Sequence, residues 1–572
     1  MKNWRFYVSV FLILFCFGAI IFRLFSLQVL KYSFYKVKAT GQYETTQVVY
    51  PMRGEIYLKD RFSNGESQTS FFPLAINKDF YKISAVPKDI EEKEETVEKL
   101  APFLTLDKEV LTQRIFKADD PYEPLESKVD EEIAQQIKEL KLKGIISESE
   151  TWRYLPANEF SCHVVGFVRQ GDGEERLGQY GVEEYYEKQL AGKTGLAKVE
   201  KDSKGQLISI DKKIIQKAED GADIILTLDP NIQSFIEGRL KTTIEKLKAP
   251  KGSIILMEAK TGAIKAMANW PRFNPNKYNE VKDISVFPNS IVHDLFEPGS
   301  IFKPITMAAA LDTGAVTPQT TYEDKGRIQI GNKVIENAVK TPQGIQTMTQ
   351  VLEKSLNTGA IFAMQKTGKE KFKEYVEKFG FDEKTGIDLP SETKGNIANL
   401  ETKRDIEYAT ATFGQGVAVT PIQLIAAFGA IANGGVLLKP YLAEKIIYKD
   451  GKEETMQKQE VRRVISSETA SRLTAMMVSV VENGFSKKAK VPGYLFAGKT
   501  GTAQIPDFKS GGYTEETIHT FGEFFPAYDA RWVLLIKIDE PKGIKFAADS
   551  LTPVAKEIAQ YILNYYEIPP SE

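Results

Sequence analysis

The sequence predicts an α+β protein that begins with a membrane helix. Three observations lead to this prediction: an uncharged run near the N-terminus, β-rich runs at both ends of the second half of the chain, and helical runs between them. Strands at both ends of a segment indicate one sheet that joins those ends and packs against the helices. The 572 residues exceed what one hydrophobic core usually organises, so two or three domains are expected.

The composition is that of an ordinary globular protein. Charged residues make up 27% and apolar residues 42%, so long disordered stretches are not expected. The 75 Lys and Arg residues balance 77 Asp and Glu residues, for a net charge of −2. No nucleic-acid partner is expected, because such partners usually require a basic stripe. The two cysteines, Cys16 and Cys162, imply no disulfide framework.

Phe6–Phe22 is an uncharged run of 17 residues and predicts a membrane-spanning helix. The apolar tract continues to Leu30, close to the roughly 20 residues that span a bilayer, and Arg23 can extend its charge to the interface. A signal peptide would carry small residues before its cleavage site, where this chain has Phe, Arg and Leu. An uncleaved anchor is therefore favoured over a signal peptide or a buried helix. Basic residues flank both ends, but long domains are translocated regardless of charge, so the bulk is expected outside the cytoplasm.

Residues 31–217 are predicted to form a first soluble region, with anchor and tail in residues 1–30. Asp130–Lys143 has apolar residues at helical spacing, Gly181–Gly192 is helix-like, and 201–217 is a Lys-rich predicted linker. Short β-rich runs lie at 46–50, 71–76 and 82–86. No catalytic pattern occurs here, so a scaffold or spacer is expected.

Residues 218–572 are predicted to form the second soluble domain. A strand at Ala222–Asp229 precedes Gly252–Trp270, where two β-rich runs flank a Lys-Thr-Gly turn and predict a hairpin. Helical stretches follow to about residue 440. Arg531–Pro541 predicts a buried strand, and the apolar residues after Val554 follow helical spacing.

A serine nucleophile with a lysine base is the chemistry that this domain favours. The chain has only three histidines, and none adjoins a Gly-x-Ser-x-Gly elbow. Ser300 and Lys303 follow a Pro-Gly pair and open an apolar helical run. Their spacing places both side chains on one helix face. In a dry pocket the ammonium form of Lys303 is disfavoured, so the amine can act as a base.

Two further elements follow in the order Ser355-Leu356-Asn357 and Lys499-Thr500-Gly501. Ser-x-x-Lys and Lys-Thr-Gly also occur elsewhere in the chain, so neither is specific alone. Their order, their contexts and a spread of about 200 residues make the combination specific. An edge strand at Lys499 would present a cation, hydroxyls and backbone N–H groups to a substrate, and Gly501 would permit close approach.

Together these elements resemble the three active-site motifs of the penicillin-interacting serine acyltransferases, within them the class B penicillin-binding proteins. The resemblance covers nearly the whole chain. Thr517–Ala527 resembles the division-type more than the elongation-type subfamily. One departure is that Leu58 and Lys59 lengthen the first landmark. The landmarks are RGEIYLKDRFSNG (53–65), WRYLPANEFSCHVVGFV (152–168), GVEEYYEKQLAGKTG (181–195) and FGQGVAVTPIQL (413–424).

The resemblance implies a pedestal domain, a transpeptidase domain with a central antiparallel sheet flanked by helices, and cross-linking of peptidoglycan stem peptides without metal or cofactor. Ser300 would attack the penultimate D-Ala carbonyl while Lys303 takes its proton. Ser355 and Lys499 would relay a proton to the departing D-Ala. Asn357 would bind the donor peptide and help to fix Lys303.

The same resemblance implies that Thr500, Gly501 and Thr502 bind substrate, and that the backbone N–H groups of Ser300 and Thr502 form the oxyanion hole. β-Lactams would be covalent inhibitors. No glycosyltransferase domain is expected in the chain, so a membrane-embedded glycan polymerase and other cell-wall proteins are the implied partners, beside the lipid bilayer.

Two other functions stay open. A D,D-carboxypeptidase or β-lactamase would share the acylation step, and a catalytically silent scaffold or sensor would not react. Glu353–Asn357 spells the Glu-x-x-Leu-Asn pattern that activates water in one kind of β-lactamase, but it overlaps Ser355 and Asn357 and supplies no separate base. The long first region is surplus for a simple hydrolase, and a sensor would need further membrane spans.

Overall fold

The structure, a computed structural model, describes residues 4–31, 44–59, 61–62, 71–118, 120–171, 176–200, 213–402, 404–507 and 510–570. The chain divides into two compact units that alternate along the sequence. The first unit contains residues 1–53 and 191–221, and the second contains residues 54–190 and 222–572.

The first unit contains the apolar helix α1 (Trp4–Phe25), which continues into the π-helical turn η1 (Ser26–Leu30). Val8–Val29 is long and apolar enough to cross a membrane and has no buried part, which fits a single-pass anchor. The unit also holds an antiparallel sheet of β1 (Glu44–Val49), β8 (Gly195–Glu200) and β9 (Lys213–Gln216), in that order. β9 falls within the predicted linker, so that prediction is wrong at 213–216, where pairing with β8 orders the chain. Residues 201–212 lie outside the described part.

A seven-stranded sheet organises the N-terminal part of the second unit. β3 (Phe72–Ala85) is one strand of 14 residues, where the sequence predicts two short ones. Its polar middle pairs continuously with β5 (Ile145–Tyr154), so the ladder between Ile76 and Ala85 is complete without an apolar sequence pattern. The order is β19 (Glu453–Thr455), β18 (Ala443–Ile447), β10 (Asp223–Leu226), β2 (Ile56–Leu58), β3 (Phe72–Ala85) and β4 (Glu123–Val129), with β5 (Ile145–Tyr154) also on β3.

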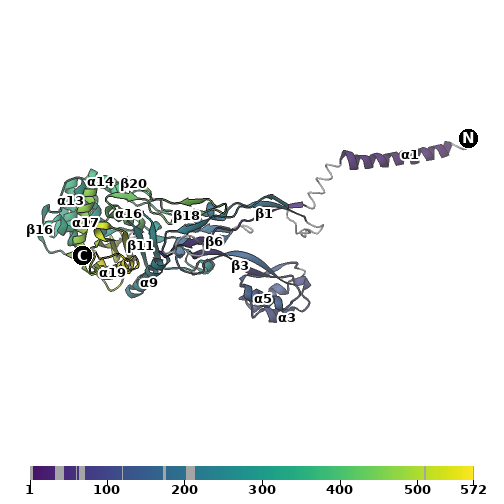
Figure 1. Ribbon diagram of the computed structural model, residues 1–572, viewed down its shortest axis with the longest axis horizontal. Coiled ribbons are helices and arrows are strands. Elements are labelled where there is room, and N and C mark those ends of the chain that lie inside the picture. The colour runs from purple at the N-terminus through teal and green to yellow at the C-terminus, as the bar shows by residue number, and fades with distance from the viewer. Residues whose placement is uncertain are drawn as a thin grey trace. The chain divides into compact units, whose positions relative to one another are not determined.

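Three helices cover the outer part of β3 and β4 and enclose a separate small core (Figure 1). Ile83, Leu111 and Ile137 lie at its centre. The three helices are α3 (Lys93–Leu100), α4 (Lys108–Ile115) and α5 (Glu131–Glu139). α5 confirms the amphipathic helix predicted within Asp130–Lys143.

A five-stranded antiparallel sheet forms the centre of the C-terminal part and joins both ends of its sequence, as predicted. The predicted hairpin and the late apolar strand both belong to it. The strand that carries Lys499 lies at its edge. The order is β12 (Ile264–Trp270), β11 (Lys251–Glu258), β23 (Trp532–Asp539), β22 (Tyr513–Phe525) and β21 (Ala497–Pro506).

This sheet is buried on both faces, because successive side chains point to opposite faces of a strand. In β23, Val533 and Leu535 belong to one core, whereas Leu534 and Ile536 belong to the other. The first face packs against α16 (Pro421–Ala432) and α17 (Ser467–Glu482). Next to these helices, α11 (Lys303–Asp312) packs on α17, and α13 (Asn357–Thr367) packs on α11. The second face packs against α9 (Pro230–Leu247), α18 (Ala547–Ser550) and α19 (Thr552–Tyr565) (Figure 1).

Shorter elements complete the second unit. The predicted helix at Gly181–Gly192 is two short helices that flank Tyr186. The helices are α6 (Cys162–Val165), α7 (Gly181–Tyr185), α8 (Glu187–Ala191), α10 (Ser290–His293), α12 (Met348–Glu353), α14 (Lys369–Lys378) and α15 (Asp405–Ala411). The strand pairs are β6 (Phe167–Gln170) with β7 (Arg176–Gln179), β13 (Thr321–Asp324) with β16 (Gly344–Thr347), β14 (Arg327–Ile330) with β15 (Lys333–Glu336), and β17 (Val436–Leu438) with β20 (Glu460–Arg463).

Glu523 in β22 is a fully buried carboxyl group. It lies two residues from both Phe521 and Phe525, which belong to the α19-side core, so its side chain points to that face. Neither carboxyl oxygen has a hydrogen-bond partner among the described residues. Burial raises the pKa of Glu523 to about 8, so the carboxyl is protonated in the folded protein at neutral pH.

This carboxyl should make stability fall as pH rises. In the unfolded chain the group ionises near pH 4.5, and in the folded protein near pH 8. Its contribution is therefore fully present below about pH 4.5 and is lost as pH rises through about 8. Between pH 5 and pH 9, the free energy of unfolding should fall by about 2–4 kcal/mol more in the wild type than in Glu523→Gln. Denaturant unfolding at the two pH values measures this difference. Parallel pH curves for the two proteins would contradict this assignment.

Candidate active site

Ser300 lies in the 3-10 turn η6 (Gly299–Phe302), which leads directly into α11. Gly299 has φ +65°, and a Cβ there would lie 2.9 Å from Ala503 Cβ in β21, so only glycine fits this turn. Ser300 is partly exposed, and its hydroxyl makes no hydrogen bond within the described chain. Lys303, the first residue of α11, is 1% exposed. The turn thus presents a free hydroxyl one turn before a buried amine.

The three predicted motifs meet at the side chain of Ser355. Lys303 Nζ donates hydrogen bonds to Ser355 O at 2.5 Å and to Ser355 Oγ at 3.2 Å. Lys499 Nζ donates to the same Oγ at 3.0 Å and to Thr500 O at 3.0 Å. Ser355 follows α12 and adopts φ +55°, a conformation uncommon for serine. The structure thus brings these three remote segments together around one hydroxyl group.

Neither lysine has a carboxylate partner among the described residues, and both side chains are buried. Burial, together with the nearby charge of Lys499, holds the pKa of Lys303 well below its usual value. Burial alone lowers the pKa of Lys499 to about 7. Both effects favour the neutral Lys303 amine, which is the form that can accept a proton.

β21 lies directly against the turn that carries Ser300. A Cβ on Gly501 would lie 2.7 Å from Pro298 O and 2.3 Å from Thr520 Oγ1, so the glycine permits this contact. Thr500 is largely buried. Thr502 Oγ1 accepts a hydrogen bond from Ala547 N at 3.1 Å, so this hydroxyl holds α18. The same hydroxyl can still donate one hydrogen bond of its own.

Asn357 begins α13, and its side-chain amide contacts a different element from the one expected. Asn357 Nδ2 donates to Glu336 O in β15 at 2.9 Å. Its contact is with the β14–β15 hairpin, and no hydrogen bond joins it to Lys303 among the described residues. The expectation that Asn357 fixes Lys303 is not met; Ser355 does so through two oxygens.

The sequence patterns did not identify Glu297 and Tyr513, which lie near Ser300. Glu297 Oε1 accepts a hydrogen bond from Gly416 N at 2.9 Å, and Glu297 Oε2 accepts one from Tyr513 Oη at 2.9 Å. Gly299 N also donates to Gly414 O at 3.1 Å. The 413–424 landmark therefore lies against the nucleophile turn. The only sequence feature that could have indicated this contact is the acidic residue Glu297 beside the Pro-Gly pair.

Two side chains considered in the sequence have structural contacts. Glu353 Oε1 accepts a hydrogen bond from Ser479 Oγ at 2.5 Å, in α17. His519 is buried, with Nδ1 2.8 Å from Ser550 Oγ. Each of these side chains therefore has a hydrogen-bond partner within the fold.

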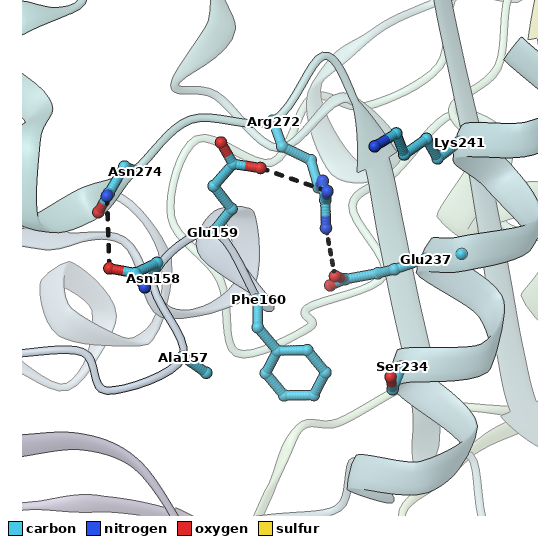
Figure 2. A pocket seen from close by; sticks show the side chains of 10 residues that line it. Ala157, Asn158, Glu159, Phe160, Ser234, Glu237, Lys241, Arg272 and Asn274 are labelled. Atoms are coloured by element: carbon cyan, nitrogen blue, oxygen red, sulfur yellow. Dashed lines mark hydrogen bonds and ion pairs between the residues drawn. The ribbon is translucent and has the colours of Figure 1, made fainter. Parts of the chain in front are cut away.

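A separate pocket of about 570 Å³ is lined by the loop at 157–160, by α9 and by residues 272–274 (Figure 2). Arg272 crosses it, pairing with Glu237 at 3.0 Å and Glu159 at 3.3 Å. Glu237 also accepts a hydrogen bond from Ser161 N at 2.8 Å. None of the three motifs contributes to its lining. These contacts fasten the 152–168 landmark to α9.

Two family models match the chain. The penicillin binding protein transpeptidase domain matches residues 252–560, and the penicillin-binding protein dimerisation domain matches residues 48–226. Stage V sporulation protein D of Bacillus subtilis is 36% identical over 89% of this chain and 77% of its own length. The probable peptidoglycan D,D-transpeptidase PenA of Neisseria gonorrhoeae is 29% identical over 97% of this chain and 92% of its own length.

A solved structure shows the same fold. Penicillin-binding protein 2X from Streptococcus thermophilus superposes with a TM-score of 0.77 at 23% identity, covering 91% of this chain and 80% of that protein. The transpeptidase match covers the central sheet and every motif that meets at Ser355. The chain therefore belongs to the class B penicillin-binding proteins of the division type, in which a dimerisation domain precedes a transpeptidase domain.

Proposed function

We propose that this protein is a penicillin-sensitive peptidoglycan D,D-transpeptidase that cross-links stem peptides through an ester on Ser300. The observation that carries the proposal is the buried Lys303 amine, which shares the Ser355 hydroxyl with Lys499 one turn from a free serine. Family membership supports the activity, since PenA and other relatives bear the name D,D-transpeptidase.

In the acylation step, Ser300 Oγ attacks the penultimate D-Ala carbonyl and its proton passes to the neutral Lys303 amine. The C–N bond to the terminal D-Ala breaks, and the departing amine takes a proton through Ser355 and Lys499. Support for this relay is the pair of hydrogen bonds from the two lysines to one hydroxyl. In the second step an amine of a neighbouring stem attacks the ester and restores Ser300.

The substrate groove is proposed along β21. The charged form of Lys499, with Thr500 and the backbone at Gly501, would bind a substrate carboxylate. Backbone N–H groups of Ser300 and Thr502 would donate hydrogen bonds to the negative charge that develops on the substrate's carbonyl oxygen. Asn357 is proposed to contact the donor peptide. The close approach of β21 to the turn at Pro298 supports this arrangement.

A hydrolase is the second candidate for the reaction. It would share the acylation step but would need a base that activates water. The engagement of Glu353 with Ser479 supports the transferase instead. For the cellular process, the relatives named FtsI homolog favour division, whereas the 36% identical relative is named for a stage of sporulation and favours that process.

The placement of the chain is also proposed. Residues 1–30 would anchor it, residues 31–217 would form the pedestal, and residues 218–572 would act outside the cytoplasm, where peptidoglycan is cross-linked. The apolar α1 supports a single-pass anchor. A membrane-embedded glycan polymerase and other cell-wall proteins are the proposed partners, because the enzyme must act on strands that another enzyme extends.

Labelling with a fluorescent penicillin tests the acylation step. The full chain in detergent should carry label on the one tryptic peptide that contains Ser300, and Ser300→Ala should carry none. Label on another peptide, or none on the wild type, would overturn the proposal. A second assay supplies a pentapeptide donor with an acceptor strand. Dimeric products support the transferase, and only shortened donor supports the hydrolase.

A further inference from the structure

Glu297 joins three segments beside the nucleophile. It lies three residues before Ser300, and its two carboxylate oxygens accept hydrogen bonds from different parts of the chain. One donor is the backbone N–H of Gly416, in the loop whose Gly414 carbonyl accepts from Gly299 N. The other is the hydroxyl of Tyr513, the first residue of β22.

Tyr513 ties the far end of the edge hairpin to this carboxylate. β21 and β22 pair from Ala497↔Phe524 to Pro506↔Tyr513, so Tyr513 lies opposite the last residue of the strand that carries Lys499. Among the described residues, β21 has a neighbouring strand on one side only. β21 contacts the turn at Gly501 and near Gly299. The hydrogen bond between Tyr513 and Glu297 holds the distal end of the same hairpin.

Glu297 is a partly buried acidic residue, and both of its hydrogen-bond donors are neutral groups. It makes no ion pair within the described residues, and burial raises its pKa. The charge of Glu407, which pairs with Arg404, acts on the Tyr513 hydroxyl that Glu297 binds. A desolvated carboxylate without a cation costs stability. Such groups concentrate at functional sites, which makes a role in positioning the better explanation.

We propose that Glu297 is a positioning residue for acyl transfer: through Tyr513 and Gly416 it clasps the hairpin and the 414–416 loop to the turn that carries Ser300. This inference rests on the proposed function. Loss of the clasp would let β21 move away from Ser300, so that the carbonyl carbon of a bound substrate no longer meets the hydroxyl at reacting distance. Displacements of about 1 Å at such sites cost roughly 100-fold in rate.

The test is the kinetics of penicillin acylation in the full chain in detergent, resolved into the dissociation constant of the initial complex and the acylation rate constant. Glu297→Ala is expected to lose about 10–100-fold in the ratio of rate constant to dissociation constant. Tyr513→Phe frees only the hairpin and should mainly raise the dissociation constant. The double variant should be no slower than Glu297→Ala, since both changes break one clasp.

Conservative rescue separates positioning from folding. In Glu297→Gln the amide oxygen can accept from Gly416 N and the amide nitrogen can donate to Tyr513 Oη, so most of the rate should return. Two matched controls should acylate like the wild type. Glu515→Gln changes an exposed glutamate of β22, and Tyr528→Phe changes an exposed tyrosine. The thermal midpoint and the fraction of chains that titrate with penicillin should stay near wild type in every variant.

A wild-type rate in Glu297→Ala would overturn the clasp, and so would a loss that only follows the fraction of folded chains. Additive losses in the double variant would overturn it as well. Each of these results requires that the wild type acylates at Ser300. If the wild type takes no label there, the proposed function has failed instead, so the two failures are distinguishable.

Discussion

Replacing Lys303 with methionine is expected to slow acylation of Ser300 by penicillin by about 10²–10⁴-fold, the usual contribution of a general base. Methionine has similar length and suits a site that is 1% exposed, so the fold should persist. The hydroxyl of Ser300 would remain, but no group within one turn could take its proton. Stopped-flow fluorescence with a fluorescent penicillin measures the rate, and thermal unfolding checks the fold.

Lys303→Arg distinguishes proton transfer from positive charge. A guanidinium group stays protonated at all accessible pH values, so it preserves the charge but cannot act as a base. The arginine variant should therefore be about as slow as the methionine variant. If it retained more than about a tenth of the wild-type rate, Lys303 would act as a cation and not as a base.

The pH dependence should follow from the same buried amine. The pKa of Lys303 lies well below its usual value, so the wild-type rate should rise with pH only in the range where the amine loses its proton, and level off above it. That rise should disappear in Lys303→Met, which has no proton to lose. A rate profile from pH 4 to pH 9 for both proteins would show whether the acid limb belongs to Lys303.

The central part of the site was predictable because its residues carry local patterns. Ser300 and Lys303 are one turn apart, and Lys499 lies in an apolar run that reads as a strand. The family resemblance then joined the segments. Local sequence patterns do not predict contacts between side chains that lie far apart in the sequence. Tyr513 meets Glu297 across 216 residues, and neither residue type is unusual in its local context.

The fold shows the same division between local and remote information. The hairpin of β11 and β12 was predicted from its two runs and the turn between them. The single long β3 was not, because β5 supplies the partner groups for its polar middle. Likewise, β9 lies in a Lys-rich stretch and becomes a strand through pairing with β8. Pairing between remote strands overrides composition in both cases.

Gly501→Ala is expected to reduce acylation by at least about 100-fold and to lower stability by about 1–3 kcal/mol. A methyl group there would lie 2.7 Å from the backbone oxygen of Pro298 and 2.3 Å from Thr520 Oγ1. The threonine can rotate, but the backbone of the nucleophile turn cannot move without Ser300. Relief of the clash therefore separates β21 from the hydroxyl that must attack a substrate held on it.

Gly238→Ala provides the matched control. Gly238 is an exposed glycine in the middle of α9, and a Cβ there meets nothing within 4 Å. Alanine is the better helix former, so this variant should gain about 0.5–1 kcal/mol and acylate at the wild-type rate. The two Gly→Ala changes are expected to alter stability in opposite directions, because backbone atoms occupy the space beside Gly501 but not the space beside Gly238. Equal acylation rates in the two variants would mean that β21 can shift by the width of a methyl group without consequence for Ser300, and the tight contact between strand and turn would then have no part in the reaction.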